Sequence, residues 1–441
     1  MTLPETADLA LDARWVIPVE PPNSVLEHHS VLIRDGVIRA VIPTEEAERR
    51  FAPRQRLSLD SHVLLPGLVN LHTHAAMTLL RGFADDLPLE QWLNARIWPA
   101  EQRHVSRRFV YDGSLLACAE MLRGGITCFN DMYFFPEAAA DAALRAGMRA
   151  ALGIIVIEFP TAYAADPQAY LDKGLTLRDQ LKEESLISFC LAPHAPYTVS
   201  DRSFSQVLTY AELLDLPIHV HLHETRGEIE SSLRDHGVRP LQRLRSLGLL
   251  GPRLLAVHGI HLTQEECALL GHHGSHVAHC PTSNLKLAGG FAPVPALLEN
   301  GVNVGLGTDG AASNNRLDLF SEMRTAALLA KAGSGDAGTL PVHDVLRCAT
   351  LSGARALGLD GKIGALVPGK RADLIAVNLQ RLELSPCYDP VSHLVYAAGR
   401  EDVSHVWIDG KPVVQDGRLL TLDTEALLAT TREWQQVIAS S

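Results

Sequence analysis

The chain has 441 residues, with 39 Lys or Arg against 51 Asp or Glu, which makes a net charge of −12 with histidine neutral. Its composition, 46% apolar and 20% charged, is that of a folded chain and excludes wholesale disorder. The acidic balance argues against nucleic acid as a partner, because phosphate binding depends on clustered Lys and Arg. No apolar run reaches about 18 residues, so we expect no membrane span and no membrane partner.

The seven cysteines are scattered, and none forms a Cys-x-x-Cys pair. The first residues also lack a basic stretch before an apolar core, so no secretory signal is expected. Together these features predict reduced thiols and a cytoplasmic location. The unusual feature of the composition is the 20 histidines.

Both ends of the chain alternate short β-type runs with turns. The runs are Ala13–Pro18, Ser30–Arg34 and Val37–Ile42 near the start, and Ala372–Asn378, Val403–Asp409 and Pro412–Gln415 near the end. Neither set is long enough for a core of its own. We therefore predict that residues 1–64 and 369–441 pair into one small β-sandwich, interrupted by everything between them.

The middle of the chain, residues 65–368, repeats short apolar strands separated by amphipathic helices. The predicted strands are Val63–Leu71, Thr127–Met132, Arg149–Val156, Ile187–Pro193, Pro217–His223, Leu254–Gly259, His276–Cys280 and Val302–Gly307. The predicted helices include Arg107–Arg123, Pro136–Ala146, Asp201–Leu214, Ile229–Leu247, Thr263–His272, Ser321–Ala332 and His343–Leu357. Eight such units favour an α/β fold of the (β/α)8 TIM barrel type. An open doubly wound sheet is the alternative, disfavoured because no Gly-x-Gly-x-x-Gly motif follows the first strand.

Titratable residues close five of the predicted strands, at the barrel end where active sites form. The first strand ends in His72-Thr73-His74, and residues two apart on a strand point the same way. The fourth, fifth, sixth and eighth strands end in His194, the His219–Glu224 segment, His258 and Asp309. Each feature alone is weak, since a lone histidine is more often a packed core residue. Their conjunction favours a metal site, because burying so many polar groups in a core would cost desolvation energy.

Several segments together resemble the amidohydrolase superfamily. They are Leu65–His74, His219–Thr225, Val257-His258 and Gly307–Gly310. The segment His279–Ala288 is typical of the branch that contains the 5′-methylthioadenosine/S-adenosylhomocysteine deaminases and the triazine chlorohydrolases. The likeness covers essentially the whole chain, including the split β-sandwich.

The resemblance implies a single metal ion per subunit, Zn²⁺ or alternatively Fe²⁺. Its expected ligands are His72, His74, His221 and Asp309. His221 is chosen over His219 and His223 because the family's metal histidine stands three residues before a glutamate, here Glu224. No lysine closes the third or fourth strand to bridge a second metal.

The implied reaction is hydrolytic deamination of 5′-methylthioadenosine or S-adenosylhomocysteine, in which a metal-activated hydroxide attacks C6 and ammonia leaves. Asp309 would take a proton from the water, and His258 would hydrogen-bond the hydroxide. Glu224 would protonate a ring nitrogen, which needs a raised carboxyl pKa. Zinc deaminases of another fold also use a separate, non-ligand glutamate.

The substrate would then be a small nucleoside. The resemblance implies that Glu101 binds the ribose hydroxyls and that His194 contacts the substrate, together with Glu224 and Asp309. Adenine could stack on Trp92 or Phe83.

The sequence leaves the substrate, a scaffold role, the residue that binds a homocysteine carboxylate and the oligomeric state open. The same metal site could serve guanine, cytosine or a chlorotriazine, and a metal-free scaffold is a less favoured reading. The arginine that would hold a homocysteine carboxylate could be Arg145, Arg149 or another. The chain could form a homo-oligomer.

Overall fold

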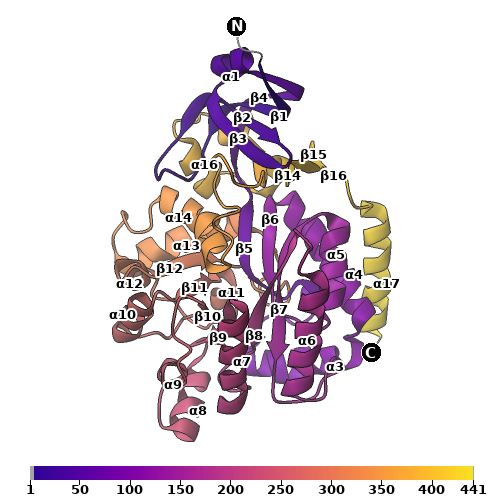
Figure 1. Cartoon of the computed structure of the whole chain (residues 1–441). Helices are drawn as coiled ribbons and strands as arrows, with labels where there is room; N and C mark the ends of the chain where they lie inside the picture. Colours follow the sequence, from indigo (N-terminus) through magenta and orange to yellow (C-terminus); the bar gives the residue numbers. More distant parts are fainter. Residues whose placement is uncertain (1–3, 441) are drawn as a thin grey trace.

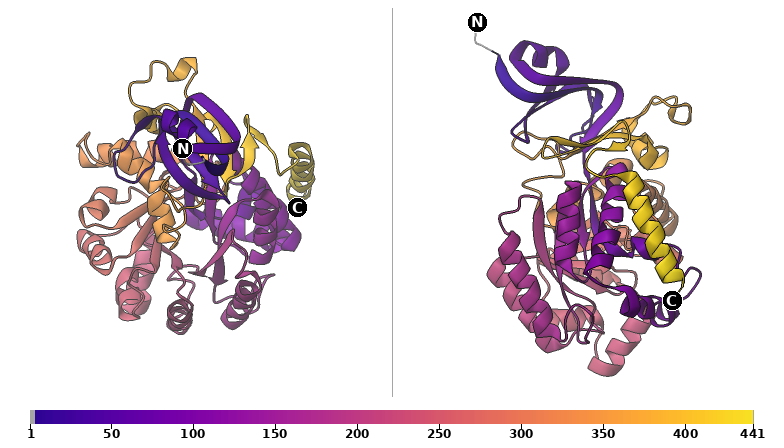
Figure 2. Two further views of the ribbon diagram at one scale, coloured as in Figure 1. Left: turned by 45° about the horizontal axis from the view of Figure 1, so that its top comes forward. Right: turned by 90° about the vertical axis from the view of Figure 1, so that its right-hand side faces the viewer.

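Eight parallel strands form the barrel that the sequence predicts. The computed structural model describes residues 4–440, with Glu90 described by its backbone only. The barrel strands are β5 (Leu68–Thr73), β6 (Ile126–Asp131), β7 (Arg149–Val156), β8 (Ile187–Pro193), β9 (Ile218–Leu222), β10 (Leu254–His258), β11 (His276–His279) and β12 (Asn303–Leu306). They pair in chain order, and Figures 1 and 2 show helices around the outside.

The barrel closes between β5 and the residues just after β12. The backbone N–H of Asp309 donates to the carbonyl of His72 at 3.0 Å. Two residues earlier on β5, the side chain of Asn70 accepts from the Thr308 N–H at 2.9 Å and donates to the Thr308 hydroxyl at 2.8 Å. This closure brings two of the predicted metal ligands, His72 and Asp309, side by side.

Helices follow most barrel strands and cover the cylinder. They are α4 (Arg107–Arg123), α5 (Pro136–Ala146), α6 (Pro167–Leu181), α7 (Asp201–Leu214), α8 (Arg226–His236), α9 (Pro240–Ser246), α10 (Gln264–His273), α11 (Pro281–Lys286), α12 (Val294–Glu299), α13 (Leu319–Ser334), α14 (Val342–Cys348) and α15 (Leu351–Ala356). Side-chain caps such as Ser106, Thr225 and Thr263 begin α4, α8 and α10 by accepting from backbone N–H groups.

Two predicted helices are each divided in the structure. The single helix expected over 229–247 is α8 and α9, because Gly237 ends α8 in a left-handed conformation with φ 71° and Pro240 then starts α9. The helix expected over 343–357 is α14 and α15, which meet where the carbonyl of Ala349 accepts from the N–H of Val69 at 2.8 Å.

The strands of both chain ends form one continuous mixed sheet above the barrel. Its order is β16-β15-β14-β13-β4-β1-β2-β3. The strands are β1 (Glu5–Val16), β2 (Leu26–Arg34), β3 (Val37–Pro43), β4 (Phe51–Pro66), β13 (Leu374–Asn378), β14 (Val403–Ile408), β15 (Lys411–Gln415) and β16 (Arg418–Leu419). The two ends of the chain meet where β4 pairs antiparallel with β13. The predicted module built from both termini is thus confirmed.

The first predicted barrel strand, Val63–Leu71, is wrong at its start. Val63 belongs to β4 of the upper sheet, which ends at Pro66, and the barrel strand begins at Leu68. Gly67 separates the two strands, and a Cβ on it would stand 2.0 Å from the Thr127 hydroxyl oxygen. The chain passes so close to β6 there that only glycine fits.

The remaining elements connect the barrel and the upper sheet. They are α1 (Thr44–Arg50), α16 (Pro390–Tyr396), α17 (Thr424–Ala439), η3 (Leu382–Leu384) and η4 (Arg400–Asp402). Helix α17 runs down the outside of α4, where Trp434 donates to Asp112 at 2.8 Å (Figure 2). Within residues 4–440, no helix combines the length and hydropathy that a bilayer crossing requires.

A long segment after β5 covers the mouth of the barrel remote from the upper sheet (Figure 1). It contains η1 (Ala75–Leu80), α2 (Leu89–Trp92), the π-helical turn η2 (Leu93–Ile97) and α3 (Trp98–His104). Short π-helical turns are frequent at functional sites. This segment supplies one wall of the cavity described next.

Candidate active site

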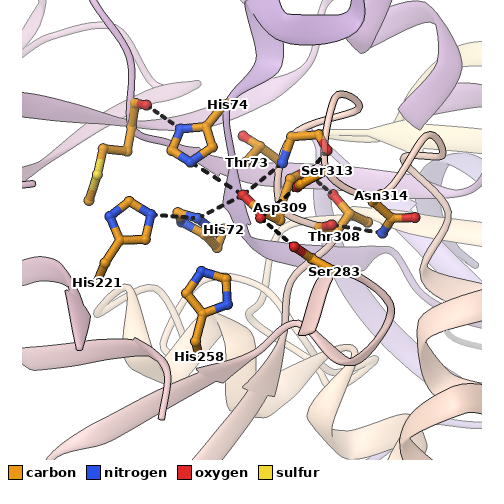
Figure 3. Close-up of polar contacts among 12 residues, drawn as sticks. His72, Thr73, His74, His221, His258, Ser283, Thr308, Asp309, Ser313 and Asn314 are labelled. Atoms are coloured by element: carbon orange, nitrogen blue, oxygen red, sulfur yellow. Dashed lines mark hydrogen bonds and ion pairs between the residues drawn. The ribbon is translucent and has the colours of Figure 1, made fainter. Parts of the chain in front are cut away.

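Histidines from three strands converge on one aspartate at the carboxyl end of the barrel (Figure 3). Asp309 Oδ1 lies 3.2 Å from Nε2 of His72 and 3.2 Å from Nε2 of His74. His221, from β9, places its Nε2 3.2 Å from His72 Nε2. The strand pairing that the fold imposes therefore gathers all four predicted metal ligands.

The donor atoms suit a divalent cation. Two groups have all their ligand atoms within 4.8 Å of one another, namely His72, His74 and Asp309, and His72, His221 and His258. Imidazole nitrogen and carboxylate oxygen are ordinary ligands of Zn²⁺, which favours about four of them.

The second nitrogen of each ligand histidine is engaged away from the centre. Nδ1 of His74 donates to the Met132 carbonyl at 2.7 Å, and Nδ1 of His221 donates to the His194 carbonyl at 2.8 Å. Nδ1 of His72 lies 2.9 Å from Nε2 of His219. Hydrogen bonds of this kind hold the tautomer in which Nε2 carries the lone pair needed for a metal.

The charges at the site favour a bound cation. Burial lowers the pKa of His72 to about 4 and the pKa of His221 well below its usual value, so both rings are neutral at pH 7. Burial also disfavours protonated His74, but the hydrogen bond and charge of Asp309 outweigh it and raise the His74 pKa to about 9. A cation would take the place of that proton.

Asp309 is held by a set of donors on its second oxygen. Oδ2 accepts from the hydroxyls of Ser283 and Ser313, both at 2.7 Å, while Oδ1 accepts from the Gly310 N–H at 2.8 Å (Figure 3). Burial opposes ionisation of Asp309, yet hydrogen bonds from His72 and His74 hold its pKa well below the usual value. Asp309 is therefore an oriented carboxylate at neutral pH.

Glu224 and His258 face each other beside the ligand cluster, with Glu224 Oε1 3.6 Å from His258 Nε2. Nδ1 of His258 donates to Oδ1 of Asn284 at 2.8 Å, so its Nε2 points into the site with a lone pair. Burial raises the pKa of Glu224, as does the charge of Asp309, while His258 acts in the opposite direction. A raised pKa suits a carboxyl group that donates a proton.

Backbone strain occurs at these same strand ends. His223, His258 and Asp309 have left-handed backbones, with φ of 55°, 70° and 62°. Such conformations cost energy for residues with a Cβ and concentrate at functional sites. Each one turns its chain sharply as the strand ends and so directs the neighbouring side chains over the barrel mouth.

A cavity of about 440 Å³ opens above the cluster and contains the two predicted substrate residues, Glu101 and His194. Glu101, on α3, accepts from the Tyr133 hydroxyl at 2.6 Å. Burial raises the Glu101 pKa to about 7, although Tyr133 and His74 oppose the rise. The His194 ring lies 5.0 Å from the His221 ring, centre to centre. Seven of the eight predicted site residues line this cavity, and His72 lies beneath it.

Two aromatic residues and two arginines were candidates for substrate contacts. Trp92 lines the cavity, whereas Phe83 does not. Neither Arg145 nor Arg149 lines it either. Arg149 begins β7, at the opposite end of the barrel, where it is buried against Asp373 at 2.8 Å.

Sequence reasoning missed the residues that support the site. Asn284 holds His258, and Ser283 and Ser313 hold Asp309. Glu228, in the first turn of α8, accepts from the N–H of His223 at 3.0 Å and of Glu224 at 2.8 Å. Ser283 and Asn284 lie inside the segment His279–Ala288 that carried part of the resemblance, so their position directly after a strand end was the available signal.

His219 and His223 lie outside the ligand cluster, although His219 is on β9 with His221 and His223 directly follows that strand. His219 contacts His72 from behind. The His223 ring turns away, and its Nε2 accepts from the Leu241 N–H at 3.0 Å.

Comparison with known proteins agrees with this fold and site. Residues 63–413 match the model of the amidohydrolase family. Over 440 residues the chain is 48% identical to a 5-methylthioadenosine/S-adenosylhomocysteine deaminase of Teredinibacter turnerae, covering 100% of both chains. It is 48% identical over 435 residues to a protein of the same name from Saccharophagus degradans, covering 99% of this chain and 98% of the relative.

Solved structures show the same fold in related proteins. A crystal structure of an adenosine deaminase from Xanthomonas campestris with bound zinc superposes with a TM-score of 0.98, at 50% identity and full coverage of both chains. An atrazine chlorohydrolase from Arthrobacter aurescens has a TM-score of 0.90 at 23% identity, covering 97% of this chain and 100% of the other, which shows a common fold. The chain belongs to the amidohydrolase family. Within that family, its full-length relatives in Teredinibacter and Saccharophagus are named as deaminases of adenosine-type thioethers.

Proposed function

We propose that this chain is a zinc-dependent deaminase that converts 5′-methylthioadenosine, S-adenosylhomocysteine or both into the inosine analogue and ammonia. The observation that carries the proposal is one cavity lined by three of the four proposed metal ligands, with His72 directly beneath them, together with a buried glutamate with a raised pKa and a histidine held by Asn284. The names of the full-length relatives and the zinc in the Xanthomonas campestris structure support it.

The proposed ligands are His72, His74, His221 and Asp309, because their donor atoms converge with lone pairs exposed. When bound, zinc lowers the pKa of a water molecule to about 7, which supplies hydroxide at neutral pH. His74, His221 and Asp309 line the cavity, so a metal held by these residues would be accessible to a substrate there.

The remaining steps belong to side chains of the protein. Asp309 accepts a proton as water attacks the amine-bearing ring carbon, and His258 hydrogen-bonds the attacking oxygen through Nε2. Glu224 delivers a proton to the adjacent ring nitrogen, so that negative charge does not accumulate on the ring. Asp309 then passes the proton that it accepted to the amino group, which leaves as ammonia. The proton of the added hydroxyl returns to Glu224 as the ring carbonyl forms.

The proposed binding residues are Glu101 and His194. A carboxylate such as Glu101 can accept hydrogen bonds from two neighbouring ribose hydroxyls at once. Its position in the cavity favours a ribosylated purine over the second candidate class, free bases and chlorotriazines. His194 stands beside His221, where it can contact the purine.

Ammonia release tests the function directly. Protein purified with zinc would be assayed with 5′-methylthioadenosine, S-adenosylhomocysteine, adenosine, guanine, cytosine and a chlorotriazine, alongside measurement of the metal content. Turnover of adenosine-type nucleosides with about one zinc per chain is the expected result. Turnover confined to a free base or triazine would select the second candidate, and absence of any stoichiometric metal would support a scaffold role.

We further propose a cytoplasmic location, because all seven cysteines are free thiols and six are buried. Assembly into a homo-oligomer is a proposal that size-exclusion chromatography with light scattering would test.

A further inference from the structure

The wall of the cavity is mostly apolar and contains three acidic side chains. These are Glu101, Glu224 and Asp309, the histidines His74, His194, His221 and His258 also line it, and its described lining contains neither lysine nor arginine. Most of the remaining lining consists of aliphatic and aromatic side chains, such as Leu93 and Ile157. These surroundings suit an uncharged group and disfavour an anion.

Two cations considered for this cavity, Lys286 and Arg149, are engaged elsewhere. Lys286 directly precedes the lining residue Leu287, but its ammonium group binds Asp85 and Asn315, both at 2.5 Å, and the Ala312 carbonyl at 3.2 Å. Arg149 is buried at the other end of the barrel between Asp373 and Asp409. A carboxylate entering the cavity would therefore meet an acidic lining without lysine or arginine, and neither Lys286 nor Arg149 would be free to pair with it.

Next to Glu101 the wall is aromatic. Trp98 lies one turn earlier on α3, and its ring contacts Phe159 edge-on, with centroids 6.1 Å apart and an interplanar angle of 63°. Phe159 is 38% exposed, so it lies at the rim. A ribose held by Glu101 would bring its 5′ substituent within reach of this pair, and thioether sulfur contacts aromatic rings favourably.

We infer that the cavity selects nucleosides whose 5′ substituent carries no ionised group, so that this chain acts on 5′-methylthioadenosine far better than on S-adenosylhomocysteine. The inference rests on the proposed function and narrows its substrate. S-adenosylhomocysteine carries both an ammonium and a carboxylate on its 5′ substituent. An acidic side chain of the wall can pair with the ammonium, but the carboxylate would lose its hydration with no lysine or arginine of the described lining to pair with, and such unpaired charges are strongly rejected. The Trp98–Phe159 pair binds the methylthio group.

The test compares kcat/KM for four substrates with the zinc-loaded protein. They are 5′-methylthioadenosine, its longer uncharged 5′-butylthio analogue, S-adenosylhomocysteine and adenosine. We expect the butylthio analogue to stay within about 10-fold of 5′-methylthioadenosine and S-adenosylhomocysteine to fall by about 100-fold or more. Equal values for 5′-methylthioadenosine and S-adenosylhomocysteine would overturn the inference. An equal loss for both long substrates would also overturn it, because length and not charge would then decide.

A variant tests the aromatic contact. Phe159→Ala should lower kcat/KM for 5′-methylthioadenosine several-fold while changing the value for adenosine little, because only the first substrate has the thioether. Leu382→Ala, an exposed change in the upper module, serves as the control. A loss shared equally by both substrates would remove the thioether assignment.

Failure of this inference is distinguishable from failure of the proposed function. If no nucleoside in the panel releases ammonia, the deaminase proposal itself is wrong. If nucleosides are deaminated but S-adenosylhomocysteine is accepted as well as 5′-methylthioadenosine, only the selection by charge is wrong.

Discussion

Nε2 of His221 lies 3.2 Å from Nε2 of His72, although the two residues are 149 positions apart in the chain. Both rings are neutral and buried, and the Nδ1 of His221 donates to a backbone carbonyl. Two nitrogen lone pairs would repel each other at this distance unless a proton or a cation stood between them. This contact supports the proposed metal site, which His74 and Asp309 would complete.

Replacing a ligand should remove the metal. His221→Ala should lower zinc content from about one to near zero per chain and abolish ammonia release, because one of four ligands is lost. His223→Gln, directly after the same strand, is the matched control, since the His223 ring turns away to Leu241. Elemental analysis of both proteins makes the comparison. Zinc lost equally from both would mean that strand disruption, not ligation, was responsible.

Glu224 should separate metal binding from turnover. Glu224→Gln keeps the shape of the side chain but cannot deliver a proton to the ring. We expect zinc content to stay unchanged while kcat falls by about 10²–10⁴-fold. Loss of zinc from this variant would show instead that Glu224 is a ligand.

Asn284 should control the orientation of His258. Its Oδ1 accepts from His258 Nδ1 at 2.8 Å, and both side chains are buried. Asn284→Leu removes the acceptor, so we expect kcat to fall by about 10–100-fold with zinc retained. Asn284→Asp keeps an acceptor at the same place, so it should retain more activity than Asn284→Leu. Full activity in Asn284→Leu would show that the contact is only structural.

Glu101 should make substrate binding depend on pH. Burial raises its pKa to about 7, partly offset by Tyr133 and His74, so the carboxylate form increases as pH rises through 7. Only the ionised form of Glu101 accepts hydrogen bonds from both ribose hydroxyls, and at pH 6 about a tenth of the Glu101 side chains are ionised. KM for a nucleoside should therefore fall between pH 6 and pH 8, and Glu101→Gln should have a higher and flatter KM. A steep KM profile that persists in Glu101→Gln would assign the titration to another group.

We expect the ion pairs of Arg149 to stabilise the contact between the barrel and the upper sheet. It donates to Asp373 at 2.8 Å and to Asp409 at 2.7 Å, and the side chains of Arg149 and Asp373 are 4% and 1% exposed. Asp373→Asn leaves a buried charge without its main partner and should lower the free energy of unfolding by about 3–5 kcal/mol. Arg234→Gln breaks an exposed pair with Asp235 and should change it by less than about 1 kcal/mol. Urea unfolding followed by circular dichroism measures both, and equal effects would contradict the role of burial.

Much of the fold was readable from local patterns. The eight apolar strands recur at intervals that favour a barrel over an open doubly wound sheet, and the two ends of the chain carry matching β-type runs. Both signals depend on residues close together in sequence, which is why they survive without tertiary information. These local patterns failed at Gly67, where the sequence reads as one strand but the structure has two. Gly67 is needed there because the chain passes close to Thr127 on another strand, and local patterns carry no information about that contact.

The sequence by itself determined which residues stand at the strand ends, since His72, His221 and Asp309 each close an apolar run. Only the tertiary structure decided how they are supported: Asn284 behind His258, Ser283 and Ser313 on Asp309, and Glu228 beneath Glu224. The reason is physical. A strand's period and polarity are set by neighbours along the chain, whereas a hydrogen bond between side chains depends on barrel closure and loop conformation, which bring distant residues within 3 Å.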